Sequence, residues 1–114
     1  VVLWTTLLIF LSFPFIMRKI TADAIRAFRN GTNFKRGNTE VRIIDTTRLL
    51  LLHGNTIARF YGQSNNLWIS SSGWQTVTTK ERLNGFPNVS IHQTNFQWFL
   101  NGKAWNGDEI MVNW

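Results

Sequence analysis

The chain has 114 residues, of which 44% are hydrophobic and only 16% are charged, against a charged share of about 25% in typical globular domains. This length fits one domain, and the apolar content excludes a disordered chain. The absence of cysteine excludes disulfide frameworks, thiolate zinc sites and cysteine nucleophiles. Twelve lysine and arginine residues against six acidic residues give a formal net charge of +6.

Residues 1–16 form an apolar, uncharged segment that differs from the rest of the chain. A membrane-spanning helix needs about 20 apolar residues, and an export signal needs a basic region before its apolar stretch, which this segment lacks. Three interpretations stay open: upstream sequence ahead of a natural start at Met17, a short membrane anchor flanked by Arg18 and Lys19, or a buried part of the fold. We therefore divide the chain into this segment and a single domain over residues 17–114.

Residues 20–31 carry the signals of an amphipathic helix. Thr21 is placed to cap the first free amide groups, and Asp23 lies where a negative charge favours the helix dipole. Asn30 and Gly31 supply a left-handed stop. An apolar stripe at helical spacing must pack on another element, and it consists of Ala24, Ile25, Ala27 and Phe28.

Short strands separated by turn residues follow this helix. Alternating apolar residues predict strands over residues 39–45, 56–61 and 67–70, with the apolar residues of 56–61 slightly out of phase. Four consecutive leucines predict a strand over residues 48–53 that is buried on both faces, although a run this short is also compatible with a helix. The predicted body of the protein is therefore rich in β-structure.

The C-terminal part of the chain continues this pattern. The sequence from Thr78 to Glu81 matches a capping box and predicts a short helix near residues 78–84. Strands are predicted over 89–92, 96–100 and 103–105, and Asn101-Gly102 is the preferred dipeptide of a type I′ hairpin turn. The expected fold class is α+β, with an N-terminal helix packed on an antiparallel β-sheet of short strands and a second short helix.

Most of the positive charge lies in one short stretch. Residues 18–36 hold six basic residues against the single Asp23, whereas residues 37–114 are nearly neutral. We expect the six to form one basic ledge on the helix and the loop that follows it: Arg18, Lys19, Arg26, Arg29, Lys35 and Arg36. Such a local excess acts on phosphates or anionic head groups, and the alternative is a solvated surface that only maintains solubility.

Aromatic residues make up 14% of the chain, with nine Phe, six Trp and one Tyr. In a small domain most of these must form the core, so the tryptophans are expected to replace aliphatic residues there. Trp74 is the best candidate for an exposed position, because it follows Gly73 in a loop before the predicted second helix. An exposed tryptophan beside basic residues is typical of proteins that stack on the bases of nucleic acids.

Four segments together resemble a known group of proteins: residues 35–41, 52–58, 73–85 and 98–107. They are similar to small uncharacterised accessory proteins of tailed bacteriophages, and the resemblance extends from Met17 to about Met111. It implies a phage or prophage accessory protein in the bacterial cytoplasm. No catalytic motif comes with this group.

Motifs of enzymes are scarce in the chain. It has no phosphate-binding loop, dinucleotide-binding turn, paired metal histidines or nucleophile elbow. His53 and His92 lie on separate predicted strands, and the adjacent Asp108 and Glu109 would point to opposite faces of a strand. We therefore expect no enzymatic activity, no metal site and no cofactor.

The sequence predicts a small non-enzymatic binding protein that engages nucleic-acid phosphates through the basic ledge, with weak sequence preference and Trp74 beside it. Two other classes stay open. One is a protein-interaction module, such as an inhibitor of a host enzyme, that binds through exposed aromatic residues, while the basic ledge itself would also suit an acidic host protein. The other is a protein anchored in the inner membrane by residues 1–16. The first two classes would act in the cytoplasm of the infected bacterium.

Overall fold

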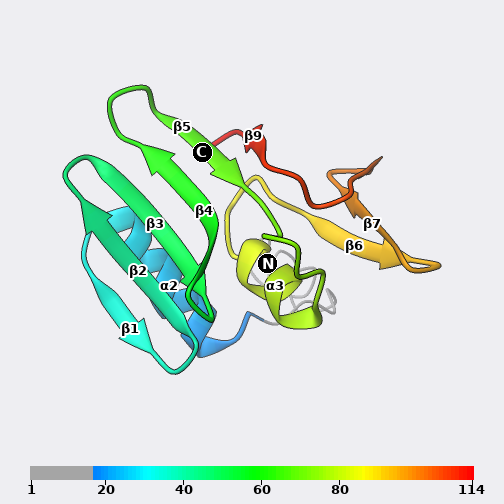
Figure 1. Ribbon diagram of the computed structural model, residues 1–114, viewed down its shortest axis with the longest axis horizontal. Helices are drawn as coiled ribbons and strands as arrows, with labels where there is room; N and C mark the ends of the chain where they lie inside the picture. Colours follow the sequence, from blue (N-terminus) through cyan, green and yellow to red (C-terminus); the bar gives the residue numbers. More distant parts are fainter. Residues whose placement is uncertain (1–16) are drawn as a thin grey trace, which may run out of the picture.

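The computed structural model describes residues 17–114 and has the predicted α+β fold (Figure 1). A six-stranded antiparallel sheet has the order β1-β2-β3-β4-β5-β9, and α2 (Lys19–Asn30) covers one of its faces. Its strands are β1 (Phe34–Arg36), β2 (Thr39–Ile44), β3 (Thr47–Leu52), β4 (Asn55–Tyr61), β5 (Asn66–Ile69) and β9 (Ile110–Val112). The sequence missed β1 and β9, which are the two edge strands.

The remaining strands form a second, three-stranded antiparallel sheet. Its strands are β6 (Ile91–Thr94), β7 (Gln97–Leu100) and β8 (Lys103–Ala104), in this order. The short helix α3 (Val77–Leu83) contacts β4 of the large sheet and β6 of the small one. The three strands predicted for this region are confirmed, and their sheet stands apart from the large sheet (Figure 1).

Helix α2 begins earlier than predicted. Its N-cap is Arg18, which makes no side-chain capping bond, so the prediction of Thr21 as the cap is wrong. Thr21 lies inside the helix, fully buried, and its hydroxyl donates a hydrogen bond to Glu81. For the same reason Asp23 falls outside the first turn. The predicted stop is confirmed, because Gly31 adopts φ 70° and donates to the carbonyls of the last turn.

Helix α3 also begins before its predicted cap. Thr76 is the N-cap, and its hydroxyl accepts a hydrogen bond from the backbone N–H of Thr79 at 3.1 Å. The predicted capping box of Thr78 and Glu81 is therefore wrong, because a better-placed threonine lies two residues upstream. The Glu81 carboxylate does not cap α3, and it accepts the hydrogen bond from Thr21 of α2 instead.

A buried arginine joins the two helices to the large sheet. Arg82 is only 2% exposed, and its guanidinium donates to the hydroxyls of Thr39 and Thr21, both at 2.9 Å. It also pairs with the carboxylate of Glu81. Because a buried cation is stable only when its donors are satisfied, this network fixes α3 against α2 and β2.

The main core lies between α2 and the large sheet. Phe28 is completely buried there, and its ring meets Phe86 at 5.2 Å and Trp114 at 5.6 Å, centroid to centroid. Trp98 of β7 and Trp105, which directly follows β8, are also buried, 1% and 7% exposed. The prediction of a tryptophan-rich core is thus correct for these two residues.

An irregularity in β3 and β4 explains a puzzling sequence pattern. Leu50 pairs with Ala58, but Leu51 pairs with Thr56, so the register shifts by one residue between them. Ile57 and Ala58 are both buried as a consequence, and the strict alternation of a strand is lost at this point. The apolar residues of this segment were out of phase in the sequence for this reason.

The hairpin predicted at Asn101-Gly102 is confirmed. Both residues have positive φ values, 50° and 87°, and the flanking Leu100 and Lys103 pair across the turn. By contrast, the segment after the first helix, which was predicted to be a loop, contains β1, whose residues pair with β2 as Phe34 with Val41 and Arg36 with Thr39.

Over residues 17–114, no helix combines the length and the apolar composition needed to cross a membrane. The three interpretations of residues 1–16 concern a segment outside the described residues. They stay predictions.

Candidate nucleic-acid interface

The exposed side of α2 carries a cluster of cations around one carboxylate. Asp23 accepts bonds from Lys19 at 2.9 Å, from Arg26 at 3.2 Å and from Arg36 of β1 at 2.7 Å. Arg36 and then Lys19 stabilise the charged carboxylate, and they lower the pKa of Asp23 from its usual 3.8 to about 2. Asp23 therefore stays ionised at physiological pH and orients all three cations.

Three cations on one anion leave an excess of two positive charges. Their side chains remain 83%, 67% and 50% exposed for Lys19, Arg26 and Arg36, so a ligand can reach them. Arg29 is exposed one helical turn from Arg26, and its guanidinium lies 5.8 Å from the ring centre of Trp114. We call these four cations, together with Asp23, the α2 basic surface.

Two of the six predicted basic residues lie differently. Arg18 stands at the N-terminal end of α2, and its backbone N–H donates to Glu81 at 3.3 Å. Lys35 lies between Phe34 and Arg36 on β1, so its side chain points to the opposite face of the sheet, where Glu40 is its cross-strand neighbour. The prediction that all six basic residues form one ledge is therefore wrong for Lys35, which lies on the other face of the sheet. The sequence could not show this, because β1 was predicted as a loop.

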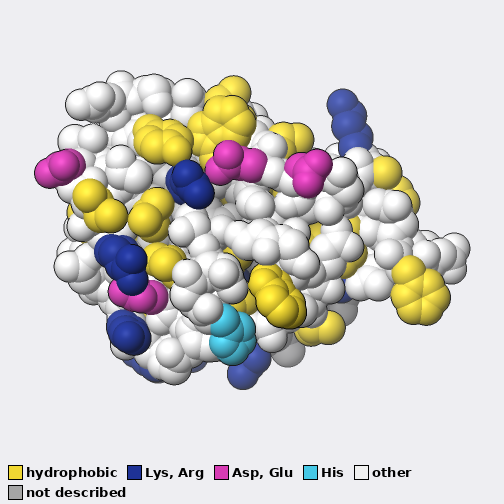
Figure 2. All heavy atoms as spheres, in the orientation of Figure 1, with side chains coloured by type: hydrophobic (Ala, Val, Ile, Leu, Met, Phe, Trp, Pro, Cys, Tyr) yellow, Lys and Arg dark blue, Asp and Glu magenta, His cyan; other side chains and the backbone are white. Residues whose placement is uncertain are grey.

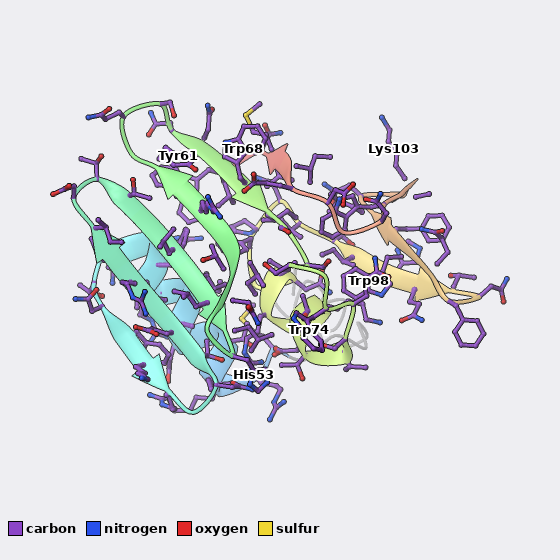
Figure 3. All side chains as sticks on the ribbon, in the orientation of Figure 1. His53, Tyr61, Trp68, Trp74, Trp98 and Lys103 are labelled. Atoms are coloured by element: carbon purple, nitrogen blue, oxygen red, sulfur yellow. The ribbon has the colours of Figure 1, made fainter. Side chains whose placement is uncertain are left out.

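Trp74 is exposed, as predicted, and it borders a pocket. Its side chain is 61% exposed, in the loop between β5 and α3. The pocket has a volume of about 480 Å³, and its walls include Trp74, His53 and Asn55. Leu52 and Ile57, both buried, provide apolar lining. Figure 3 shows His53 and Trp74 side by side at one end of the sheet, with Tyr61 and Trp68 at the other.

The pocket and Arg36 of the α2 basic surface lie at the same end of the large sheet, whereas Arg29 lies toward the other end, where its carbonyl accepts from Arg48. Arg36 pairs with Thr39, and Thr39 pairs with Leu52, which lines the pocket. Two strand spacings of about 4.8 Å therefore separate the Arg36 backbone from the pocket wall. The turns are also bonded together, because the backbone N–H of His53 donates to the carbonyl of Asn38 at 2.8 Å.

The open face of the large sheet was not anticipated from the sequence. One row of cross-strand neighbours runs across five strands: Arg42, Leu49, Arg59, Trp68 and Met111. Ile44, Tyr61 and Met111 on this face are 50%, 37% and 52% exposed. In Figure 2 hydrophobic side chains gather on this side of the molecule among a few charged ones. Only the strand register brings these residues together, which is why sequence patterns did not reveal them.

The two histidines do not converge. His53 lies in the turn between β3 and β4, while His92 is on β6 of the small sheet, stacked on Phe99 with ring centres 5.1 Å apart. In the described part of the chain, no three or more histidine and acidic residues are grouped in a way that could hold a metal ion. The arrangement offers surfaces for binding, and its chemistry is that of cations, an aromatic ring and hydroxyl groups.

The fold and these surfaces define a small α+β protein with a basic helical side and an aromatic-lined pocket at one end of its sheet. Residues 17–113 match the family described as Kyanoviridae Gp96 protein, and the chain belongs to this phage protein family. The predicted resemblance to phage proteins is thereby confirmed. No curated protein and no solved structure matches the chain.

Proposed function

We propose that this phage protein is a non-enzymatic nucleic-acid-binding protein whose α2 basic surface contacts phosphates. The observation that carries the proposal is the arrangement of Lys19, Arg26 and Arg36 around Asp23. Arginine forks match phosphate oxygens, and a shared carboxylate holds these forks in place before a ligand arrives. The net excess of positive charge on this surface then favours a polyanion.

Phosphate contacts of this kind carry little sequence information, so we expect weak sequence preference. They also release counterions, which makes affinity fall steeply as salt is added. Because nucleic acid is the ligand, the proposed place of action is the cytoplasm of the infected bacterium. The same surface would also attract an acidic host protein, and a comparison of the two ligands at equal salt distinguishes them.

The test is the salt dependence of binding to a short labelled DNA duplex, measured by fluorescence anisotropy. We expect log affinity to fall linearly with log salt, and the slope to decrease by about one unit for each phosphate that the double variant Arg26→Ala with Arg29→Ala no longer neutralises. The matched control is Arg42→Ala with Lys103→Ala, which removes the same charge from elsewhere on the protein and should leave most of the slope intact. Affinity that is indifferent to salt would refute the proposal.

Protein recognition is a second candidate function, and the open sheet face supports it. Ile44, Tyr61 and Met111 expose apolar area on this face, and exposed apolar patches of folded proteins commonly mark interaction sites. If this face binds a host protein, Tyr61→Ala with Met111→Ala should abolish copurification of that protein from infected cells. DNA binding of the same variant should be unchanged, since α2 lies on the other side of the sheet.

The membrane-anchored alternative depends on residues 1–16. Fractionation of cells that express the chain from Val1 and from Met17 tests it directly. A membrane anchor predicts that only the longer product sediments with membranes.

A further inference from the structure

Trp74 is an exposed aromatic residue on a loop whose backbone is held firmly. The N–H of Trp74 donates to the carbonyl of Ser71 at 2.9 Å, and the N–H of Ser71 donates to the carbonyl of Gly107 at 2.8 Å. The side-chain amide of Gln75 donates to the backbone carbonyl of Asn106 at 2.6 Å. These bonds fix the loop on both sides of the tryptophan, while its ring remains 61% exposed.

The backbone of this loop is also specialised. Ser72 and Gly73 have φ values of 52° and 83°, and a serine at positive φ costs conformational energy. Gly107 is required beneath the loop, because a Cβ at this position would collide with the hydroxyl of Ser71. The backbone of this loop is thus strained and closely packed, and it holds the Trp74 ring in a fixed position facing solvent. Such an arrangement indicates a preformed binding platform.

The pocket beside this ring has the size and the chemistry of a site for a planar heterocycle. Its volume of about 480 Å³ lies within the range of small-ligand sites, about 300–1,000 Å³. Leu52 and Ile57 supply apolar contact, and His53, Asn55 and Thr78 supply hydrogen-bonding groups. None of the residues that line the pocket is a carboxylate, so the walls do not repel an anionic strand.

We propose that this pocket binds one unstacked base of a single-stranded nucleic acid, with Trp74 stacked on the base. The inference rests on the proposed function, and it identifies single strands as the preferred substrate. Arg36 of the α2 basic surface lies at the same end of the sheet, and the exposed side chains of Arg36, Arg26 and Lys19 are available to the phosphates of the same strand. A base inside a duplex is stacked on both faces and paired along one edge, so it cannot enter the pocket without being unstacked and unpaired.

The experiment compares three probes at low salt by fluorescence anisotropy: a short oligo(dT) strand, a duplex of matched length, and a strand of the same length made of abasic nucleotides. Wild-type protein should bind oligo(dT) more tightly than the other two. Trp74→Ala should weaken oligo(dT) binding about tenfold, in the range found for loss of one stacking platform, and leave the abasic strand unaffected. Trp74→Phe should retain most of the affinity because it keeps an aromatic face.

Tyr61→Ala is the matched control, since Tyr61 is a partly exposed aromatic residue at the opposite end of the sheet. It should bind all three probes like the wild type. The base pocket would be refuted if Trp74→Ala bound oligo(dT) as tightly as the wild type, or if it lost as much affinity for the abasic strand as for oligo(dT). In either case, salt-dependent binding of all three probes would still support the proposed function. If the wild type bound none of the probes, both proposals would be wrong.

Discussion

The large sheet has one face beneath α2 and one face open to solvent, and side chains of similar type have different environments on the two. Phe28, Val41 and Leu50, at the interface between α2 and the sheet, are at most 1% exposed. On the open face Ile44 and Met111 are about half exposed. The covered face therefore supplies most of the apolar burial that stabilises the fold, and the open face is free to make other contacts.

The largest expected effect tests this division by truncating one apolar side chain on each face. Phe28→Ala should lower the free energy of unfolding by about 4 kcal/mol, because it removes a fully buried ring and leaves a cavity. Ile44→Ala on the open face should cost about 1 kcal/mol, since half of that side chain is already in water. Urea unfolding of both variants measures the two values. Equal losses would show that the faces are energetically alike.

A smaller effect contrasts a buried ion pair with an exposed one. Arg82→Ala should destabilise the protein by about 3 kcal/mol, because it removes the guanidinium that pairs with Glu81 and donates to two buried threonine hydroxyls. Arg42 pairs with Glu40 at 3.2 Å on the open face and is half exposed, so Arg42→Ala should cost less than about 1 kcal/mol. The same urea titration measures both. A comparable loss in the two variants would contradict the role given to the Arg82 network.

The smallest effect concerns pH and the α2 basic surface. The folded-state pKa of Asp23 is about 2, below its usual 3.8, so its ionised form stabilises the fold above about pH 4 and this contribution disappears as the pH falls toward 2. Asp23→Asn should therefore be less stable than wild type near neutral pH, and the two stabilities should converge in acid. Thermal unfolding at several pH values follows this convergence. A constant difference down to pH 2 would mean that Asp23 does not contribute through its charge.

Local signals in the sequence predicted much of the secondary structure. The helix stop at Gly31 and the hairpin turn at Asn101-Gly102 depend on residues that adopt positive φ. In each case an Asn-Gly dipeptide is enough to predict the structure. The start of α3 was misplaced because Thr76, Thr78 and Thr79 are all possible caps. The start of α2 was misplaced because Thr21, the predicted cap, is buried in the helix and bonded to Arg82. Strands β1 and β9 have only three residues each, too few for a periodic pattern.

The candidate site was predictable in part. Charge clustering pointed to α2, and the Gly73-Trp74 loop pointed to an exposed tryptophan, but neither signal contained the distance between them. That distance depends on the register of β1, β2 and β3, which brings Arg36 and Leu52 to the same end of the sheet. Strand register also decides which face of the sheet Lys35 lies on. It likewise determines the row of cross-strand neighbours on the open face that includes Trp68.

The strand order places β1 and β9 at the two edges of the large sheet, and these edges differ in their tendency to recruit another chain. β1 offers only three residues, two of them the cations Lys35 and Arg36, so two copies brought edge to edge there would repel each other. β9 is equally short, but its residues Ile110, Met111 and Val112 are uncharged. Aggregation by strand addition would therefore begin at β9, and Met111→Lys is the substitution that would suppress it.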